Sequence, residues 1–298
     1  LSASQMKALS SGLLLFLRPF TRVRRMSSSA SSGASAKTAS PDEIKKFNEM
    51  AKEWWDPNGP FAGLHDYNPT RLAFIKKHAL KGKETDKMEP LKGLRILDIG
   101  CGGGILSEAM ARMGGEVTGI DMSEESVKVA EQRRQSFGSE GFASRLSFSH
   151  GEIGDVADSV KDHQQKVEKG EEVGDSVAPF DVVVASEIIE HVDDIEGFFY
   201  GCTRCVKGNG GVLVVTTLNR TPESYLLAIV GAEYVTGIVP KGTHDWSKFV
   251  TPKHLDNLAK LSGMRKIEIQ GVSYIPVVRQ FVQEPFARVN YMAAYEKP

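Results

Sequence analysis

The chain has 298 residues, enough for one large domain or two small ones. Apolar residues make up 41% and charged residues 25%, which is typical of a soluble globular protein with a hydrophobic core. All 38 acidic residues but only 31 of the 37 basic ones follow position 40, so this part carries a net charge of −7. An acidic body argues against general nucleic-acid binding. Three cysteines are too few for a disulfide scaffold and suit a reducing compartment.

Residues 1–40 form a basic leader without Asp or Glu. Its apolar centre, residues 13–17, precedes four arginines, whereas a secretory signal carries its positive charge first. Together with the many serines, this order favours a mitochondrial presequence that is cleaved between Arg25 and Ser40. A disordered tail and a plastid transit peptide have similar compositions and stay open as alternatives. Residues 41–298 are then the folded domain.

Two helices are predicted at the start of this domain, over 42–55 and, after an Asn68-Pro69 turn, over 70–80. A charged linker, 81–88, separates them from an alternation of strands and helices. Strands are expected at 95–99, 116–120, 145–149, 180–185 and 211–217, and helices at 105–113, 124–137, 195–207 and 252–261. Such an alternation predicts a parallel sheet with helices on both faces.

The remaining segments depart from this alternation. Two terminal strands, 265–271 and 289–296, are predicted as an antiparallel pair. Residues 155–178 are polar and charged without a clear period, which indicates a surface insertion. Cys202 and Cys205 have the spacing of half a zinc site or of a redox pair. They fall inside a predicted helix, so we expect them to serve helix packing instead.

A glycine-rich turn follows the first strand, in the run 97–104. A dinucleotide-binding loop requires glycine at the first, third and sixth places. Gly100 and Gly102 fit the first two, but Ile105 stands at the sixth. The spacing Asp98-x-Gly100-x-Gly102-x-Gly104 instead resembles class I methyltransferases, which bind S-adenosylmethionine. The backbone at Gly100 and Gly102 would then approach the sugar and amino-acid part of this ligand. This resemblance implies a Rossmann-like α/β fold: a seven-stranded, mostly parallel sheet with helices on both faces, an antiparallel terminal strand and an N-terminal helical extension.

Two acidic residues accompany this turn. Asp98 lies at the end of the first strand, where it would face the ammonium group of the ligand. Asp121 ends the second strand, and a carboxylate at that place can accept hydrogen bonds from both ribose hydroxyls. The alternative for Asp121 is a helix N-cap, a role that Ser123 or Ser126 could fill instead.

A third polar cluster follows the fourth strand, at the sheet edge where open α/β sheets bind their ligands. Glu187, Glu190 and His191 are spaced i, i+3 and i+4, which places them on one face of a helical turn. Two carboxylates and an imidazole can hold a divalent cation, Mg²⁺ or Mn²⁺ by their oxygen majority, with Zn²⁺ also possible. The alternative is a capped helix start with exposed acids, and spacing alone favours it.

Several longer stretches are similar to the ubiquinone-biosynthesis O-methyltransferase family of bacteria and mitochondria. The Trp pair at 54–55 and the block 240–245 are more selective for this family than the glycine turn, which all class I methyltransferases share. The resemblance covers about residues 42–298. The matching stretches are 47–56, 68–72, 97–106, 117–122, 187–192, 217–220, 230–234 and 239–245.

This resemblance implies a reaction and a set of residues. S-adenosylmethionine would methylate a phenolic oxygen of a polyprenylated catechol or hydroxyquinol in two steps of ubiquinone synthesis. Cofactor contacts fall on Arg71, Gly100, Asp121 and Ser186, with the Arg71 guanidinium clamping the methionine carboxylate. The cation site of the family maps onto Glu187, Glu190 and His191. A bound Mg²⁺ or other divalent cation would activate the phenolate, so the triplet would act in catalysis through the metal.

The resemblance also implies partners and a place in the cell. Because a polyprenyl tail does not leave lipid, the enzyme would lie peripherally on the matrix side of the mitochondrial inner membrane. We expect it to belong to a multiprotein ubiquinone-synthesis complex and to bind no nucleic acid. Residues 224–246 are apolar but too interrupted to span a bilayer, and they would lie in its interface. A core or lid helix over the active site is the alternative.

Two other functions stay open. The chain could methylate nitrogen or carbon on another small molecule, or it could be a cofactor-binding scaffold in a biosynthetic assembly. If His191 ligates a metal it cannot accept the phenol proton, which leaves His150 and His244 as candidate bases. His150 is more typical of a loop residue.

Overall fold

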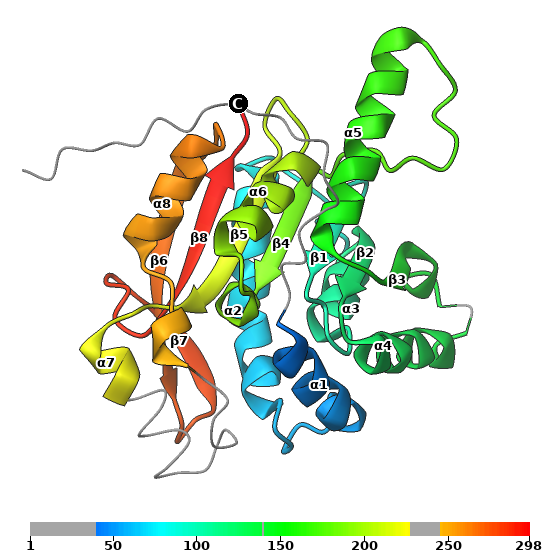
Figure 1. Cartoon of the computed structure of the whole chain (residues 1–298). Coiled ribbons are helices and arrows are strands. Elements are labelled where there is room, and N and C mark those ends of the chain that lie inside the picture. Colours follow the sequence, from blue (N-terminus) through cyan, green and yellow to red (C-terminus); the bar gives the residue numbers. More distant parts are fainter. Residues whose placement is uncertain (1–39, 139, 227–244) are drawn as a thin grey trace, which may run out of the picture. The chain divides into compact units, whose positions relative to one another are not determined.

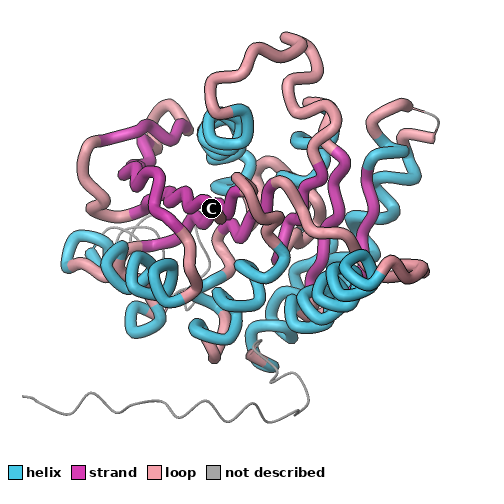
Figure 2. Tube along the Cα trace, turned by 90° about the horizontal axis from the view of Figure 1, so that it is seen from above, coloured by secondary structure: helices cyan, strands magenta, loops and turns pink. Residues whose placement is uncertain are grey.

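The computed structural model describes residues 40–138, 140–226 and 245–298. From residue 95 onward its strands and helices alternate, and Figure 2 shows helices on both sides of the sheet. The longer helices are α1 (Pro41–Met50), α2 (Ala62–Leu80), α3 (Ile105–Arg112), α4 (Glu124–Ser136), α5 (Ile153–Lys169), α6 (Ile195–Cys205) and α8 (Pro252–Leu261), and α7 (Pro222–Ser224) is a single turn. The strands are β1 (Arg95–Ile99), β2 (Glu116–Asp121), β3 (Leu146–His150), β4 (Val182–Ser186), β5 (Val212–Leu218), β6 (Arg265–Ile275), β7 (Gln280–Glu284) and β8 (Asn290–Glu296).

The strands form one sheet in the order β3-β2-β1-β4-β5-β8-β6-β7 (Figure 1). β1 to β5 run parallel, and β8 lies antiparallel between β5 and β6, which confirms the predicted terminal pair. Within the described ranges the sheet has eight strands, not the expected seven. The additional strand, β7, pairs antiparallel with β6 and forms the sheet edge.

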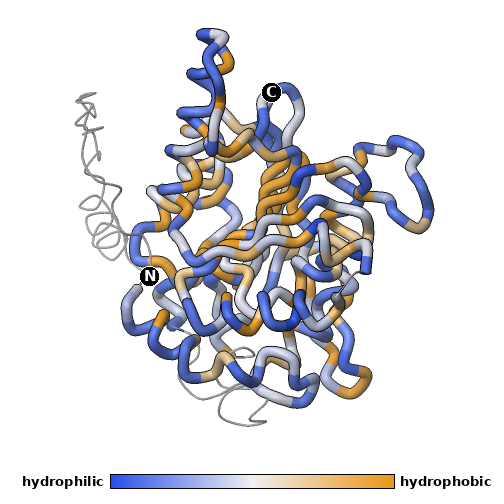
Figure 3. Tube along the Cα trace, turned by 90° about the vertical axis from the view of Figure 1, so that its right-hand side faces the viewer, coloured by the Kyte–Doolittle hydropathy of each residue, from blue (hydrophilic) through white to orange (hydrophobic). Residues whose placement is uncertain are grey.

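Both faces of the sheet are buried, so alternate residues of each central strand enter different hydrophobic clusters. On β4, Val182 and Val184 pack with α2 and α3, whereas Val183 and Ala185 pack with α5, α6 and α8. The strands accordingly form the most hydrophobic part of the chain in Figure 3. Cys202 and Cys205 of α6 are free thiols in the cluster that contains Val183 and Ala185. This position confirms that the pair serves helix packing.

Two predictions about helices are wrong. α2 begins at Ala62 and runs through Asn68-Pro69, where a turn was expected. One face of this helix buries Tyr67, Phe74 and Ile75, and this burial outweighs the local cost of a proline inside the helix. α1 is shorter than predicted because it ends at Met50 and continues as a 3₁₀ turn, Ala51–Glu53.

The predicted surface insertion 155–178 is mostly α5, a regular helix. The prediction that its apolar residues follow no regular spacing is therefore wrong. Ile153, Ala157 and Val160 are buried at helical spacing and pack against α6. The remainder of α5 is polar and extends away from the sheet in Figure 1.

Within the residues described, we find no helix with both the length and the apolar character needed to cross a membrane. Most of the predicted interfacial segment 224–246, namely 227–244, lies outside the described residues.

Candidate active site

A cavity of about 520 Å³ lies at the carboxyl ends of β1, β2 and β4. α1, α2 and the hairpin of β6 and β7 form its other walls. All the predicted site residues except Gly102 line it: Arg71, Asp98, Gly100, Asp121, Ser186, Glu187, Glu190 and His191. The carboxyl edge of a parallel sheet thus brings together residues that are far apart in sequence.

The glycine turn between β1 and α3 requires glycine for reasons of packing. Gly100, Gly102 and Gly104 have φ angles of 70°, 53° and 84°, in the left-handed region that L-residues rarely adopt. A Cβ on Gly100 would lie 2.6 Å from Ile188, and one on Gly102 would lie 2.3 Å from the Trp54 ring. The residue that closely approaches Gly102 is therefore Trp54, and Gly102 does not line the cavity, so its contact with the cofactor stays a prediction.

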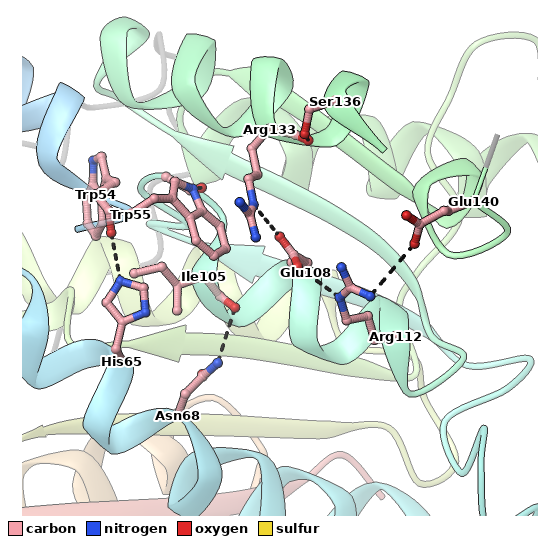
Figure 4. Close-up of polar contacts among 11 residues, drawn as sticks. Trp54, Trp55, His65, Asn68, Ile105, Glu108, Arg112, Arg133, Ser136 and Glu140 are labelled. Atoms are coloured by element: carbon pink, nitrogen blue, oxygen red, sulfur yellow. Dashed lines mark hydrogen bonds and ion pairs between the residues drawn. The ribbon is translucent and has the colours of Figure 1, made fainter. Parts of the chain in front are cut away.

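Side chains from the segment between α1 and α2, and from α2 itself, bond to the backbone at the start of α3 (Figure 4). Trp55 donates its indole N–H to the Gly103 carbonyl at 2.9 Å, and the Arg133 guanidinium lies 3.9 Å from the centre of the Trp55 ring. The Asn68 amide donates to the Ile105 carbonyl at 3.2 Å. The N-terminal helical extension is thus part of the glycine-turn structure, and the Trp pair is the signal that pointed to it.

Asp121 organises the same turn from the end of β2. Its carboxylate accepts the Gly102 N–H at 2.8 Å and the Ser123 N–H at 2.7 Å. Burial raises the pKa of Asp121 above its ordinary value, and the two backbone bonds oppose this rise. Ser123 accepts the Ser126 N–H and is the N-cap of α4, so the alternative role for Asp121 is excluded. Each carboxylate oxygen can still accept a further hydrogen bond from a ribose.

Asp98 is buried in β1 and accepts the Ser107 hydroxyl at 2.5 Å. Burial raises its pKa to about 6, against the opposing effects of Ser107 and Arg71. A buried carboxylate without a salt bridge is costly, and an ammonium ligand in the cavity would offset this cost.

Arg71 of α2 is only 3% exposed, which excludes an ordinary surface arginine. Its Nη1 donates to Ser186 Oγ at 3.0 Å, and its Nη2 donates to Leu64 O and to Asn68 Oδ1. Burial lowers the pKa of the guanidinium. Its Nε has no hydrogen-bond partner in the described part of the chain. The Nε and the second Nη1 hydrogen are therefore the donors available to a carboxylate ligand.

Tyr67, one turn before Arg71 on α2, was not predicted as a site residue. It lines the cavity, and its ring stacks on Phe281 of β7 with centroids 4.2 Å apart. Burial and the nearby Glu187 charge raise its pKa well above the ordinary value, so the phenol stays protonated. No local pattern could have found it, because β7 is more than 200 residues away.

The two acids and the histidine after β4 do not share one helical face. Glu187 has a φ of 54°, outside the 3₁₀ turn Ile189–His191, so the predicted helical arrangement is wrong. Each side chain has a different partner: Thr216 donates to Glu187, Thr217 donates to Glu190, and the His191 Nδ1 bonds to Glu43 of α1. Burial, followed by the Glu190 charge, raises the pKa of Glu187 to about 7.

These three side chains have the donor types that suit a divalent cation, and all of them line the cavity. Among the described residues, however, no three His, Cys, Asp or Glu side chains converge as metal ligands. The donor chemistry fits a cation, whereas the arrangement of the side chains does not present a formed site.

The candidate bases receive no support. His150 at the end of β3 is exposed, bonds to the Met122 carbonyl at 3.2 Å and does not line the cavity. His244, with most of the block 240–245, lies outside the described residues.

Comparison with known proteins agrees with this geometry. Residues 90–252 match the family model of a methyltransferase domain. The ubiquinone biosynthesis O-methyltransferase of Maricaulis maris is 41% identical over 258 residues, 87% of this chain and 93% of that protein. The protein of the same name from Psychrobacter arcticus is 40% identical over 264 residues, 87% of this chain and 95% of that protein. Magnesium protoporphyrin IX methyltransferase from Synechocystis, crystallised with SAH, has a similar fold, with a TM-score of 0.56, 15% identity and coverage of 85% of this chain and 95% of that one.

Proposed function

Because the chain belongs to the ubiquinone biosynthesis O-methyltransferase family, we propose that it transfers a methyl group from S-adenosylmethionine to phenolic oxygens in ubiquinone synthesis. The acceptors are polyprenylated catechol and hydroxyquinol intermediates. The observation that carries this proposal is identity of about 40% to curated members along almost their whole length. The cavity supports it, because polar groups for a cofactor and an apolar wall for a prenylated ring line the same space.

Methyl transfer is an in-line displacement at a sulfonium carbon, so the protein acts mainly by positioning. Asp121 would accept the ribose hydroxyls of the cofactor, and Asp98 would face its ammonium group. Arg71 Nε would bind its carboxylate beside Ser186. Around the acceptor, Leu64, Phe198 and Phe281 exclude water from the reacting atoms.

We extend the proposal to a divalent cation, Mg²⁺ in the first instance, held by Glu187, Glu190 and His191. When bound, such a cation stabilises the phenolate and orients the neighbouring ring oxygen. The half-buried Glu187 and the buried Glu190 support this idea, because a cation would neutralise two neighbouring acids that have little contact with water. Assembly of the site requires His191 to leave Glu43 or to bind the cation through its other ring nitrogen.

We also propose the cellular setting that the sequence predicts. Residues 1–40 direct the protein to the mitochondrial matrix, and the domain of residues 41–298 works peripherally on the inner membrane, within a ubiquinone-synthesis complex. Residues 224–246 contribute to the membrane contact or close over the active site. The basic, acid-free leader and the lipid character of the acceptor support this setting.

The direct test is methylation by the purified chain of a catechol with a short prenyl tail, with methyl-labelled S-adenosylmethionine and detection of the methoxy product by mass spectrometry. We expect turnover by the wild type and loss of turnover and of cofactor binding in Asp121→Ala. Turnover of a nitrogen or carbon acceptor in place of the catechol would favour a different methyltransferase. An Asp121→Ala protein that binds no cofactor yet restores quinone production in cells would favour a scaffold.

The cation is tested separately. Removal of metal with a chelator, verified by elemental analysis, should abolish turnover, and Mg²⁺ should restore it. Calorimetry should show Mn²⁺ binding to the wild type and weakened binding to Glu190→Gln. Full turnover without residual metal would overturn the cation and leave the methyltransferase assignment intact.

A further inference from the structure

The hairpin of β6 and β7 forms a wall that rises beyond the carboxyl edge of the sheet. The last β8 partner of β6 is Asn290, paired with Val272, yet β6 continues for three more residues and returns as β7. Tyr274, Pro276 and Phe281 from this extension line the cavity. One side of the hairpin thus belongs to the active site.

The tip of the hairpin is apolar and exposed. Val277 is 94% exposed and Val278 is 56% exposed, in the turn that follows Pro276. Ile275 and Val282 nearby are also exposed large hydrophobic residues. Water contact with four such side chains within eight residues is unfavourable, and patches of this kind mark sites of interaction.

The tip is held in place rather than loosely attached. The Arg279 guanidinium bonds to Asp66 Oδ2 at 3.0 Å, to Asn58 Oδ1 at 3.0 Å and to Pro57 O at 2.7 Å. Tyr274 donates to the same Asp66 at 2.8 Å. Arg279 itself has a φ of 50°, an uncommon backbone conformation that these bonds stabilise. The valines are therefore presented by a fixed turn.

The charge of this region distinguishes it from the rest of the domain. Residues 275–283 contain one arginine and no acid, within a domain whose net charge is −7. The neighbouring turn between β7 and β8 repeats the pattern, with Phe286 65% exposed and the Arg288 guanidinium 5.8 Å from the centre of its ring. The Arg279 charge is paired with Asp66, so Arg288 beside the exposed Phe286 is the arginine of this region that can face anionic headgroups at a bilayer surface.

We propose that the tip of the β6–β7 hairpin docks on a bilayer, with Val277 and Val278 inserted among the lipids. The inner side of the hairpin then lies between lipid and cavity and gives a prenylated acceptor an apolar path to the reacting atoms. The inference rests on the proposed function for its choice of a lipid surface. It names a surface distinct from residues 224–246.

The chain offers matched controls at the other end of the sheet. Met88, which precedes β1, is 82% exposed, and Leu261, which precedes β6, is 86% exposed. β1 and β6 run in the same direction, and both residues lie near the amino ends of these strands, whereas the cavity lies at the carboxyl ends. Met88→Asp and Leu261→Asp combined in one variant add two charges, as many as two aspartates in the hairpin, without touching the hairpin.

The test is flotation of the full chain with vesicles of equimolar phosphatidylcholine and phosphatidylglycerol, without substrate. We expect the double variant Val277→Asp, Val278→Asp to lower vesicle partitioning by about tenfold, and the double control Met88→Asp, Leu261→Asp to leave it unchanged. With a short-tailed catechol in solution, kcat and KM of the double variant should match the wild type. With a long-tailed acceptor in vesicles, its KM should rise.

Unchanged flotation of the double hairpin variant, or an equal loss in the double control, would overturn the proposal. A loss of self-association in light scattering with unchanged flotation would assign the hairpin to a second copy of the chain, paired through the edge strand β7, and would also overturn it. Because flotation needs no substrate, failure of docking is distinguishable from failure of the methyltransferase assignment. Normal turnover by a protein that does not bind vesicles would overturn the docking proposal and leave the methyltransferase assignment intact.

Discussion

Trp54 occupies the space that a side chain on Gly102 would need: a Cβ at position 102 would lie 2.3 Å from the indole ring. The same indole donates its N–H to Ser126 Oγ at 2.9 Å, and the ring stacks on Phe61 with centroids 3.7 Å apart. The glycine turn and the N-terminal aromatic residues are therefore one structure, although they are 48 positions apart. A change in either should affect cofactor binding through the other.

Gly102→Ala should lower thermal stability, weaken SAH binding and change the Trp fluorescence, because Trp54 must move away. Gly170→Ala is the control: Gly170 also has a positive φ, 69°, but no atom lies within 4 Å of the added Cβ. Both variants share the backbone cost of about 1–2 kcal/mol for a left-handed residue. Only Gly102→Ala should lose cofactor, and adding Trp54→Ala should cost less in that background than in the wild type. Equal behaviour of the two alanine variants would contradict the packing argument.

The fold was largely predictable because buried strands and amphipathic helices have distinct periods in the sequence. β1, β2 and α8 lie within one residue of their predicted ranges. The failures have physical causes. Pro69 lies inside α2 because burial of Tyr67 and Phe74 outweighs the local turn preference. β7 was missed because it is short and because β6 is the one described strand with which it pairs.

The site was predictable only where local patterns carry it. Gly100 and Asp121 follow from a strand-turn-helix pattern and line the cavity as expected. Glu43 and Tyr67 have no local pattern, since their partners lie on distant elements that the fold brings together. Glu187 kept its place in the cavity but not its predicted helical geometry, because its left-handed backbone turns it toward Thr216.

Arg71→Lys should weaken SAH binding by about tenfold or more and lower the free energy of unfolding by about 1–3 kcal/mol. One ammonium group cannot replace a guanidinium that bonds to Ser186, Leu64 and Asn68 at once. Arg265→Lys is the control, because Arg265 is exposed and its partner Glu296 can pair with lysine. Calorimetry with SAH and thermal melting measure the two effects. Wild-type affinity in Arg71→Lys would remove Arg71 from the cofactor site.

Glu43→Ala should loosen α1 at the site, because the Glu43 carboxylate accepts the His191 Nδ1–H at 2.9 Å and so links this helix to the turn after β4. Hydrogen exchange over residues 41–50 should accelerate, and SAH should dissociate faster. The bond with His191 lowers the pKa of Glu43, so its contribution is complete above the ordinary pKa of the carboxyl and is lost as the pH falls through the lowered value. Glu49→Ala, at an exposed position on the same helix, should change neither exchange nor dissociation.

Asp98→Asn should stabilise the protein without cofactor at neutral pH while it weakens cofactor binding. Burial raises the Asp98 pKa to about 6, so the native state binds its proton more tightly than the unfolded chain does. The free energy of unfolding therefore falls as the pH rises from about 4 to about 6, by up to about 3 kcal/mol. Asparagine has no such titration and can still accept the Ser107 hydroxyl.

Thermal melts from acidic to neutral pH should show an advantage for Asp98→Asn that grows with pH, whereas exposed Asp175→Asn should follow the wild type. A variant less stable than the wild type at neutral pH, with normal SAH affinity, would show that Asp98 is a structural acid and does not face the cofactor.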